Sequence, residues 1–379
     1  MAQTFFPISK FYLFHRDANI NYQLNRFLIS GLEDLFAELG RQIENFDDWK
    51  QLFLAKASFF ETGGRTDWAT GLYRAAEFFM NPDDPDKTIA YEKFVSLFYQ
   101  AKEGRNFERI AVPYGSNRLH GFRLTPSTAV KGIILIHGGF DSYIEEFYPL
   151  GAAMCETGFE VVMFDGPGQG TTLMREKLPM THEWEKPVAA ILDYLGIHNV
   201  TLIGISLGGY LAVRAASREP RVQRVIADDV MLDFFASVTS RRGKFAELLI
   251  RGLVKQRSSL ILNAVARVMI RRDMYSRWGI AQGMHVMGCK TPYEFFLKLE
   301  NYNGYTASRS VAGDVLILAG AEDHFVPLEQ FFEQLKLLTG ARSVTGRLFT
   351  SKEQAQSHCQ VGNLGLAALH MLGWIEDHS

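Results

Sequence analysis

Hydrophobic residues recur at intervals of three and four through the first hundred positions of the chain. Residues spaced in this way lie on one face of a helix. A stretch rich in proline and aspartate, residues 81–85, interrupts the pattern and is suited to begin a further helix. The spacing predicts helices over residues 24–39, 49–60, 69–80 and 87–100.

The pattern changes beyond residue 105. Two short strand-like runs, 109–114 and 119–124, flank the polar residues 115–117, which predicts a β-hairpin. Farther along, short continuous apolar runs alternate with helical stretches, which is typical of a largely parallel sheet covered by helices. These further predicted strands are residues 132–136, 161–164, 200–203, 222–227, 315–318 and 343–349.

One interval has no strand pattern. Between residues 227 and 315 the chain has helical spacing instead, for example over 244–254 and 258–272. We therefore predict an α/β fold with a mostly parallel central sheet, a helical N-terminal region and a helical cap inserted after a core strand. The predicted divisions are the helical region 1–105, the first part of the core 106–230, the cap 231–305 and the second part of the core 306–379.

Composition narrows the class of protein. The 379 residues are 47% hydrophobic and 22% charged, which is typical of a globular protein. The net charge of −2 argues against a nucleic-acid partner. The chain has neither an uncharged apolar run of about 18 residues nor the apolar stretch of a signal peptide, so no membrane association is expected. The three cysteines are scattered, which indicates reduced thiols in a cytoplasmic protein.

The clearest chemical signal is the pattern G-x-S-x-G at residues 204–208, which directly follows a predicted strand and precedes a helical pattern. A serine in a tight strand-to-helix turn exposes its Oγ, and the flanking glycines avoid steric clashes. The N-terminus of the following helix favours negative charge. We therefore predict that Ser206 is a nucleophile.

A serine nucleophile needs a base, and the base needs an acid that orients it. In this arrangement the chain order is serine, then acid, then histidine. Asp323 and His358 each follow a predicted strand and fit this order. Asp228 or Asp229, at the end of an earlier strand, remains an alternative acid. His370 lies within a helical pattern and is a weaker candidate for the base.

The oxygen of a tetrahedral intermediate needs N–H donors. The predicted strand 132–136 leads into His137, two glycines and Phe140, and glycine lets the backbone approach a substrate closely. We predict that the N–H groups of Gly139 and Leu207 are the donors, with Phe140 as the alternative to Gly139. We interpret His137 as a support for this loop.

Neither a cofactor nor a metal ion is expected. The glycine-rich residues 165–170 lack the GK[ST] ending of a phosphate-binding loop and are interpreted as a turn at a strand end. No group of histidine, cysteine, aspartate and glutamate residues has the sequence spacing of a metal site.

Residues 107–379 resemble the α/β-hydrolase superfamily. More narrowly, the chain is similar to the FrsA-like esterase group, which includes fungal polyketide-shortening hydrolases and the 2,6-dihydroxypseudooxynicotine hydrolase type. The stretches that carry this similarity are residues 137–146, 164–170, 204–209 and 357–363.

The resemblance implies a helical N-terminal region beside a cap, the triad Ser206, Asp323 and His358, and a homodimer. Several members of the group cleave carbon–carbon bonds beside ketones rather than esters. We therefore expect a serine hydrolase acting on an ester or a β-diketone-type bond of a polyketide-like or aromatic secondary metabolite. An acyltransferase or cyclase using the same acyl-serine remains an alternative, as does a catalytically silent binding protein.

The predicted cap supplies apolar and aromatic residues for a pocket above the nucleophile. Together with Phe140, the residues expected to bind a small-molecule substrate are Tyr275, Trp278, Met284 and Tyr302. The cap also carries 12 basic and 5 acidic residues. This excess has three interpretations: a solvated helix face, a site for an anionic group of the substrate, or a docking surface for an acidic acyl carrier protein.

Overall fold

The computed structural model describes residues 5–102, 104, 106–240 and 243–379. Its centre is an eight-stranded sheet with the order β1-β2-β4-β3-β5-β6-β7-β8. β2 pairs antiparallel with β1 and β4, and all other neighbours are parallel, which confirms the predicted sheet. The strands are β1 (Phe107–Tyr114), β2 (Asn117–Leu124), β3 (Ile133–His137), β4 (Glu160–Asp165), β5 (Val200–Ile205), β6 (Val222–Asp228), β7 (Asp314–Gly320) and β8 (Ser343–Phe349).

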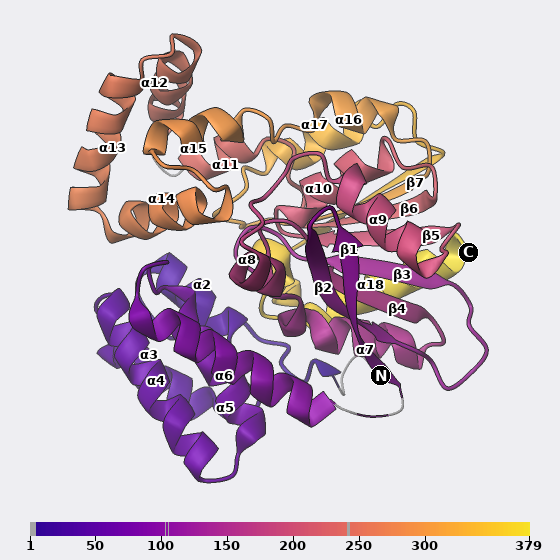
Figure 1. Ribbon diagram of the computed structural model, residues 1–379, viewed down its shortest axis with the longest axis horizontal. Coiled ribbons are helices and arrows are strands. Elements are labelled where there is room, and N and C mark those ends of the chain that lie inside the picture. The colour runs from indigo at the N-terminus through magenta and orange to yellow at the C-terminus, as the bar shows by residue number, and fades with distance from the viewer. Residues whose placement is uncertain (1–4, 103, 105, 241–242) are drawn as a thin grey trace.

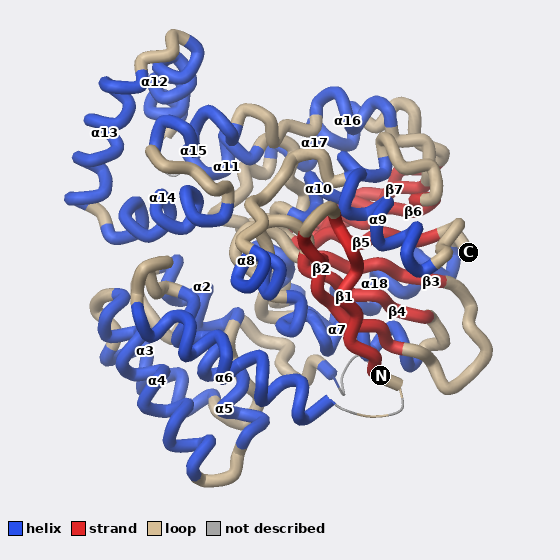
Figure 2. The backbone as a smooth tube through the Cα atoms, viewed as in Figure 1, coloured by secondary structure: helices blue, strands red, loops and turns tan. Residues whose placement is uncertain are grey.

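The central strands are buried on both faces, which explains their continuous apolar runs. Every residue of β4, β5 and β7 is buried. Successive side chains point to opposite faces, so Val161 and Met163 join one hydrophobic cluster whereas Val162 and Phe164 join another. Helices cover both faces of this sheet (Figure 2).

Two helix pairs pack directly on the sheet. The pair α7 (Tyr148–Glu156) and α18 (Leu364–Asp377) contributes to one hydrophobic cluster, and α9 (Glu185–Leu195) and α10 (Gly208–Ala216) contribute to the other. None of the described helices has the length and apolar character needed to cross a membrane. The other helical elements of the core are η1 (Ile144–Phe147), α8 (Gly170–Glu176), α16 (Tyr305–Ser310), α17 (Glu329–Leu337), η2 (Ser351–Glu353) and η3 (His358–Gln360).

The N-terminal region is helical, as expected. The predicted single helix over residues 24–39 is wrong, because the structure has two helices there, the first ending at Arg26 and the second beginning at Glu33. Gly31 lies between them with φ of +85°, a conformation that glycine adopts readily. The helices are α2 (Ala18–Arg26), α3 (Glu33–Gln42), α4 (Phe46–Thr62), α5 (Thr66–Phe78) and α6 (Pro85–Lys102).

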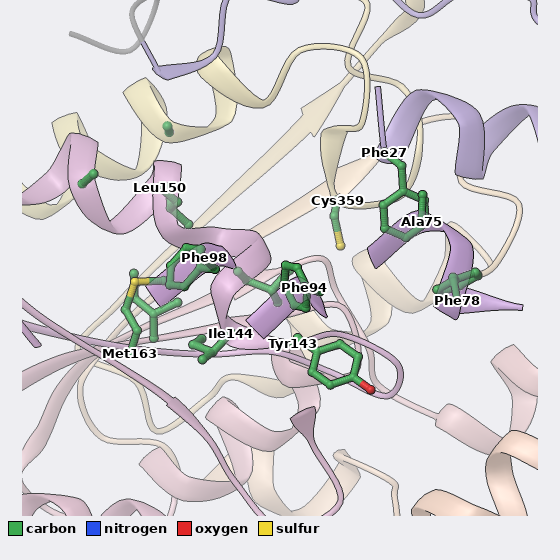
Figure 3. Packing of buried hydrophobic residues seen from close by; sticks show 14 of the residues in the cluster. Phe27, Ala75, Phe78, Phe94, Phe98, Tyr143, Ile144, Leu150, Met163 and Cys359 are labelled. Carbon is green, nitrogen blue, oxygen red and sulfur yellow. The ribbon is translucent and has the colours of Figure 1, made fainter. Parts of the chain in front are cut away.

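These N-terminal helices share a core with the sheet. Phe94 and Phe98 of α6 belong to the same buried cluster as Ile144, Leu150 and Met163, and Figure 3 shows these side chains gathered together. The helical region therefore packs as part of the core. Residue 105, where the sequence predicts that this region ends, lies outside the described residues.

The cap lies between β6 and β7 in the chain and above the N-terminal helices in Figure 1. Hydrogen bonds between described residues join the cap to the N-terminal region. The Tyr275 hydroxyl donates to Asp17 at 2.5 Å, and the Trp278 indole N–H donates to the carbonyl oxygen of Phe78 at 3.0 Å. The cap helices are α11 (Phe234–Ser240), α12 (Lys244–Lys255), α13 (Ser259–Arg272), α14 (Met274–Val286) and α15 (Pro292–Leu299).

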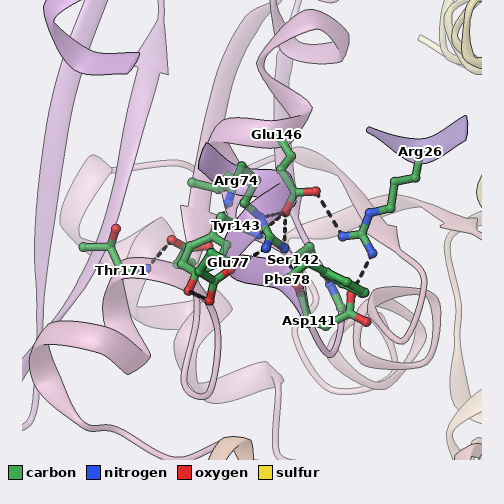
Figure 4. A network of polar contacts seen from close by, with 12 residues as sticks. Arg26, Arg74, Glu77, Phe78, Asp141, Ser142, Tyr143, Glu146 and Thr171 are labelled. Carbon is green, nitrogen blue, oxygen red and sulfur yellow. Dashed lines mark hydrogen bonds and ion pairs between the residues drawn. The ribbon is translucent and has the colours of Figure 1, made fainter. Parts of the chain in front are cut away.

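A buried network of charges connects the N-terminal helices to the segment after β3 (Figure 4). The carboxylate of Glu146 accepts hydrogen bonds from Arg26 at 3.0 Å and from Arg74 at 2.8 Å. Arg74, whose side chain is 2% exposed, also pairs with Glu77. Burial alone would raise the pKa of Glu146, but the two guanidinium groups outweigh it and the pKa is lowered.

Replacing Glu146 with alanine tests this network. The change leaves two buried guanidinium groups with fewer partners, so we expect the free energy of unfolding to fall by about 3–5 kcal/mol. Glu92→Ala is the control, because Glu92 pairs with Arg175 on the exposed surface, where a salt bridge contributes less than about 1 kcal/mol. Urea denaturation measures both changes, and equally small losses would contradict the structural role of Glu146.

Candidate active site

Ser206 lies in the tight turn between β5 and α10. Its φ is +61°, a strained value for a residue other than glycine. The Ser206 N–H donates to the carbonyl oxygen of Asp228 at 2.7 Å, which ties the turn to the end of β6. Strain of this kind in a tight strand-to-helix turn is typical of a reactive position.

The glycines around Ser206 are required by close packing. A Cβ atom on Gly204 would lie 1.9 Å from the carbonyl oxygen of Gly208. A Cβ atom on Gly208 would lie 2.7 Å from the carbonyl oxygen of Gly138, and one on Gly209 would lie 2.1 Å from that of Asp229. The motif therefore has glycine at these positions because the backbone of neighbouring segments leaves no room for a Cβ atom.

The structure brings Ser206, His358 and Asp323 together in one line of hydrogen bonds. His358 Nε2 lies 2.8 Å from Ser206 Oγ, and His358 Nδ1 lies 2.6 Å from Asp323 Oδ2. The other oxygen of Asp323 accepts the backbone N–H groups of Phe325 at 2.7 Å and Val326 at 3.1 Å. Asp323 is therefore held in place independently of the histidine.

The pKa shifts of Asp323 and His358 are consistent with a hydrogen-bonded pair of opposite charge. Burial acts to raise the pKa of Asp323, but His358 and the two backbone N–H groups outweigh it, so the pKa is lowered. Burial acts to lower the pKa of His358, but the carboxylate of Asp323 outweighs it and the pKa is raised well above its ordinary value. The pair thus favours an imidazolium beside a carboxylate.

The two alternative acids, Asp228 and Asp229, lie near His358 but make other contacts than Asp323 does. Asp229 Oδ2 is 3.7 Å from His358 Nδ1 and accepts the Cys359 N–H at 3.2 Å. Burial, followed by the charge of Asp323, raises the pKa of Asp229 well above its usual range. Asp228 lines the cavity described below, and burial raises its pKa to about 7. Of the carboxylates of Asp323 and Asp229, that of Asp323 lies closer to His358 Nδ1, at 2.6 Å against 3.7 Å.

Asp229, Asp323 and His358 also place one ligand atom each within 4.8 Å of one another, a spacing that a metal ion can use. Both ring nitrogens of His358, however, already have hydrogen-bond partners in Asp323 and Ser206. The arrangement therefore fits proton transfer better than metal binding.

The loop after β3 lies directly beside the nucleophile, since a Cβ atom on Gly139 would be 3.0 Å from the Cβ of Ser206. The Gly139 N–H, however, donates to Ser142 Oγ at 2.9 Å. Among the described residues, the N–H groups of Phe140 and Leu207 have no hydrogen-bond acceptor. The structure thus favours Phe140, the alternative of the two sequence candidates in this loop.

Two side chains support this loop. Gln169 Nε2 donates to the carbonyl oxygens of Gly138 at 2.6 Å and Gly139 at 3.0 Å. His137 is fully buried and packs against Trp184, and burial lowers its pKa to about 4, so it is uncharged at neutral pH. The glycine-rich turn at 165–170 therefore holds the loop after β3.

A cavity of about 500 Å³ opens above Ser206 and His358. Its volume is suited to a drug-sized organic molecule. Apolar cap residues form much of its wall, including Met231, Phe234, Ile250, Met269, Phe295 and Phe296. Three of the residues expected to bind substrate also line it, namely Phe140, Tyr275 and Trp278.

The other two residues expected to bind substrate are not in this lining. Tyr302 is 2% exposed and packs against Tyr210 and Phe234. Met284 packs against the hydrophobic cluster that the cap shares with one face of the sheet. Both belong to the interior of the cap and its contact with the core, so this part of the prediction is corrected.

The sequence prediction missed one wall of the cavity, which α2 provides. Asn19, Tyr22, Gln23 and Arg26 line the cavity from this helix. Their spacing of three and four is a helical signal, but the residues are polar and resemble a solvated face. The unusual density of amides in this short helix was the signal that could have identified it.

Comparisons with known proteins agree with this fold. The family description "alpha/beta hydrolase fold" matches residues 132–343, more than half of the chain. The chain is 30% identical over 304 residues to Hydrolase acrC of Aspergillus aculeatus, covering 70% of each protein. It is 28% identical over 340 residues to 20-hydroxy-prefusarin hydrolase FUS2 of Gibberella moniliformis, covering 81% of this chain and 79% of that protein.

Solved structures show the same fold. The crystal structure of 2,6-dihydroxy-pseudo-oxynicotine hydrolase has a TM-score of 0.64 at 20% identity and covers 94% of this chain and 95% of its own. The structure of AbyA5 has a TM-score of 0.68 at 18% identity and covers 94% of each chain. The predicted family is therefore confirmed, and the chain is a hydrolase that belongs to the α/β-hydrolase family.

Proposed function

We propose that this protein is a serine hydrolase in which Ser206 is the nucleophile, His358 the general base and Asp323 the acid that orients the base. The observation that carries the proposal is the pair of hydrogen bonds of His358, at 2.8 Å to Ser206 Oγ and 2.6 Å to Asp323 Oδ2. Geometry of this kind supports proton transfer between serine and imidazole.

The first step is attack on a carbonyl carbon. His358 Nε2 takes the proton of Ser206 as Oγ forms a bond to that carbon, and Asp323 stabilises the resulting imidazolium. The negative charge on the carbonyl oxygen is stabilised by the N–H groups of Phe140 and Leu207, which have no other acceptor in the described structure. Loss of one such donor lowers kcat by roughly 10²–10³.

In the second step the bond to the leaving group breaks, and His358 returns its proton to that group. In an ester the leaving atom is oxygen, and in a β-diketone it is the enolate carbon. Water, activated by the same histidine, then releases the acyl group from Ser206.

We propose that the substrate is a polyketide-like or aromatic secondary metabolite. The apolar cap wall and a cavity of about 500 Å³ support this class. The curated relatives offer further support, because FUS2 is named for 20-hydroxy-prefusarin. The chemistry proposed for Ser206 is the same for an ester and for a carbon–carbon bond beside a ketone.

Active-site labelling tests the proposal. A fluorophosphonate probe is expected to label the wild-type protein and to leave Ser206→Ala unlabelled, because the probe traps a serine activated by a base. Hydrolysis of a p-nitrophenyl ester by Ser206→Ala should fall by about 10⁶ in kcat. Ser217→Ala, at the other end of α10, is the matched control and should be labelled normally. Full labelling of Ser206→Ala would contradict the assignment of the nucleophile.

The pH dependence tests the role of Asp323. His358 must be uncharged to accept a proton, and Asp323 raises its pKa, so kcat/KM should fall as the pH drops through a value above the ordinary histidine pKa of about 6.5. In Asp323→Asn the charge is lost while burial persists, so the midpoint should move to lower pH, and kcat should drop by about 10⁴. The pH–rate profiles of both proteins measure this shift. An unchanged midpoint in Asp323→Asn would contradict the pairing.

A further inference from the structure

One face of α2 turns toward the cavity. Asn19, Tyr22, Gln23 and Arg26 follow one another at intervals of three, one and three residues, which places them on a single helical face. All four line the cavity that also contains Ser206. The N-terminal helical region therefore provides a polar wall opposite in character to the apolar wall of the cap.

Two amides on this face have unmet hydrogen-bonding capacity. Asn19 is 5% exposed and Gln23 is 3% exposed, and the side-chain carbonyl oxygen of each is buried without a hydrogen-bond partner in the described part of the chain. A buried polar atom without a partner destabilises a protein, so such atoms call for an explanation. A ligand in the cavity that donates hydrogen bonds supplies one.

The two other buried amides of α2 provide an internal comparison. The side-chain oxygen of Asn21 accepts the N–H groups of Phe14 at 2.7 Å and His15 at 3.0 Å. That of Asn25 accepts the N–H of Tyr12 at 2.7 Å. These amides hold the extended segment before the helix. Within the described part of the chain, the side-chain oxygens of Asn19 and Gln23 accept no such hydrogen bond.

The polar face lies next to the proposed base. The Tyr22 hydroxyl donates to the carbonyl oxygen of His358 at 3.2 Å, and the two rings are 6.4 Å apart. Asn19 and Gln23 flank Tyr22 on the same helical face. A third acceptor, Asp228 Oδ1, is also buried without a partner in the described structure and belongs to the cavity lining.

The charges of the lining indicate which polar group would bind. The two terminal nitrogens of Arg26 are occupied by Asp141 at 3.1 Å and Glu146 at 3.0 Å. This cation is therefore neutralised, whereas Asn19, Gln23 and Asp228 all offer acceptor oxygens. The wall suits a neutral group that carries N–H or O–H donors better than it suits an anion.

We propose that Asn19 and Gln23 are specificity-determining residues that bind a neutral, N–H- or O–H-bearing group of the substrate, while the apolar part of the substrate lies against the cap. This inference rests on the proposed function, since it takes the cavity above Ser206 as the substrate site. The substrate class is thus narrowed to amphipathic carbonyl compounds with an amide, lactam or hydroxyl group separate from the bond that breaks.

Binding to the Ser206→Ala protein tests this inference without catalysis. The ligands are methyl ketones of graded chain length that end in a primary carboxamide, a hydroxyl, a carboxylate or an isopropyl group, the last being the apolar counterpart of the carboxamide. At the best chain length we expect the carboxamide or hydroxyl ketone to bind at least about 10-fold more tightly than the isopropyl ketone, because an apolar group leaves the buried acceptors unpaired. The carboxylate ketone should show no such preference. Isothermal titration calorimetry measures each Kd.

Asn19→Leu and Gln23→Met are each added to Ser206→Ala. In these variants the Kd values of the polar ketone and the isopropyl ketone should differ by no more than about twofold. The thermal midpoints of these variants should stay level or rise, because each change removes a buried group without a partner. Asn21→Leu and Asn25→Leu are the matched controls, and they should lower the thermal midpoint while the preference survives.

The inference is overturned if no chain length shows tighter binding of the polar ketone than of the isopropyl ketone. It is also overturned if Asn19→Leu and Gln23→Met both keep this difference in affinity, or if both lose thermal stability as the controls do. Fluorophosphonate labelling of the protein with an intact Ser206 separates this inference from the proposed function. Normal labelling without the preference overturns only the role of Asn19 and Gln23. The preference without labelling overturns only the role of Ser206 as nucleophile.

Discussion

The site depends on one imidazole that contacts two side chains from distant parts of the chain. His358 contacts Ser206 and Asp323 at the same time. Because the three residues are far apart in the sequence, the sheet has to bring them together. Each of the three residues follows a strand, and parallel strands end at the same edge of a sheet. The order of β5, β6, β7 and β8 therefore converts sequence separation into contact.

Two helical units, the cap and the N-terminal region, lie at the edge of the sheet where Ser206, Asp323 and His358 meet. The cap occupies the interval between β6 and β7, and α2 approaches from the N-terminal region. Tyr275 joins the cap to Asp17 at the start of α2, and Tyr22 joins α2 to His358. The cavity is therefore lined by the cap, by α2 and by core segments that include Ser206 and His358, with much of the cap wall apolar and the α2 wall polar. This division supports selection of an amphipathic substrate.

Much of the fold, and the line of hydrogen bonds from Ser206 through His358 to Asp323, could be predicted from the sequence, because the signals are local. A buried parallel strand is a continuous apolar run, and the turn at Ser206 needs glycines at fixed positions because of contacts such as that between Gly204 and Gly208. The order of serine, acid and histidine then limits the candidates. The choice of Asp323 over Asp229 depends on distances of 2.6 and 3.7 Å to His358, which only the folded chain defines.

The pocket could not be predicted in the same way. Tyr302 and Met284 have the same apolar character as Phe234, and only the packing of the cap decides which of them lines the cavity. Asn19 and Gln23 resemble surface residues in sequence, yet the folded chain buries them against the cavity. Burial that arises from contacts between distant segments leaves little trace in local periodicity.

The most direct test of the central claim is the proton NMR resonance of the imidazole N–H shared between His358 and Asp323. The account predicts a strongly downfield resonance at low pH, where His358 is protonated. It should disappear in Asp323→Asn and persist in Asp229→Asn. A resonance that survives in Asp323→Asn but is lost in Asp229→Asn would contradict the account, because the imidazole would then be oriented by the other carboxyl group.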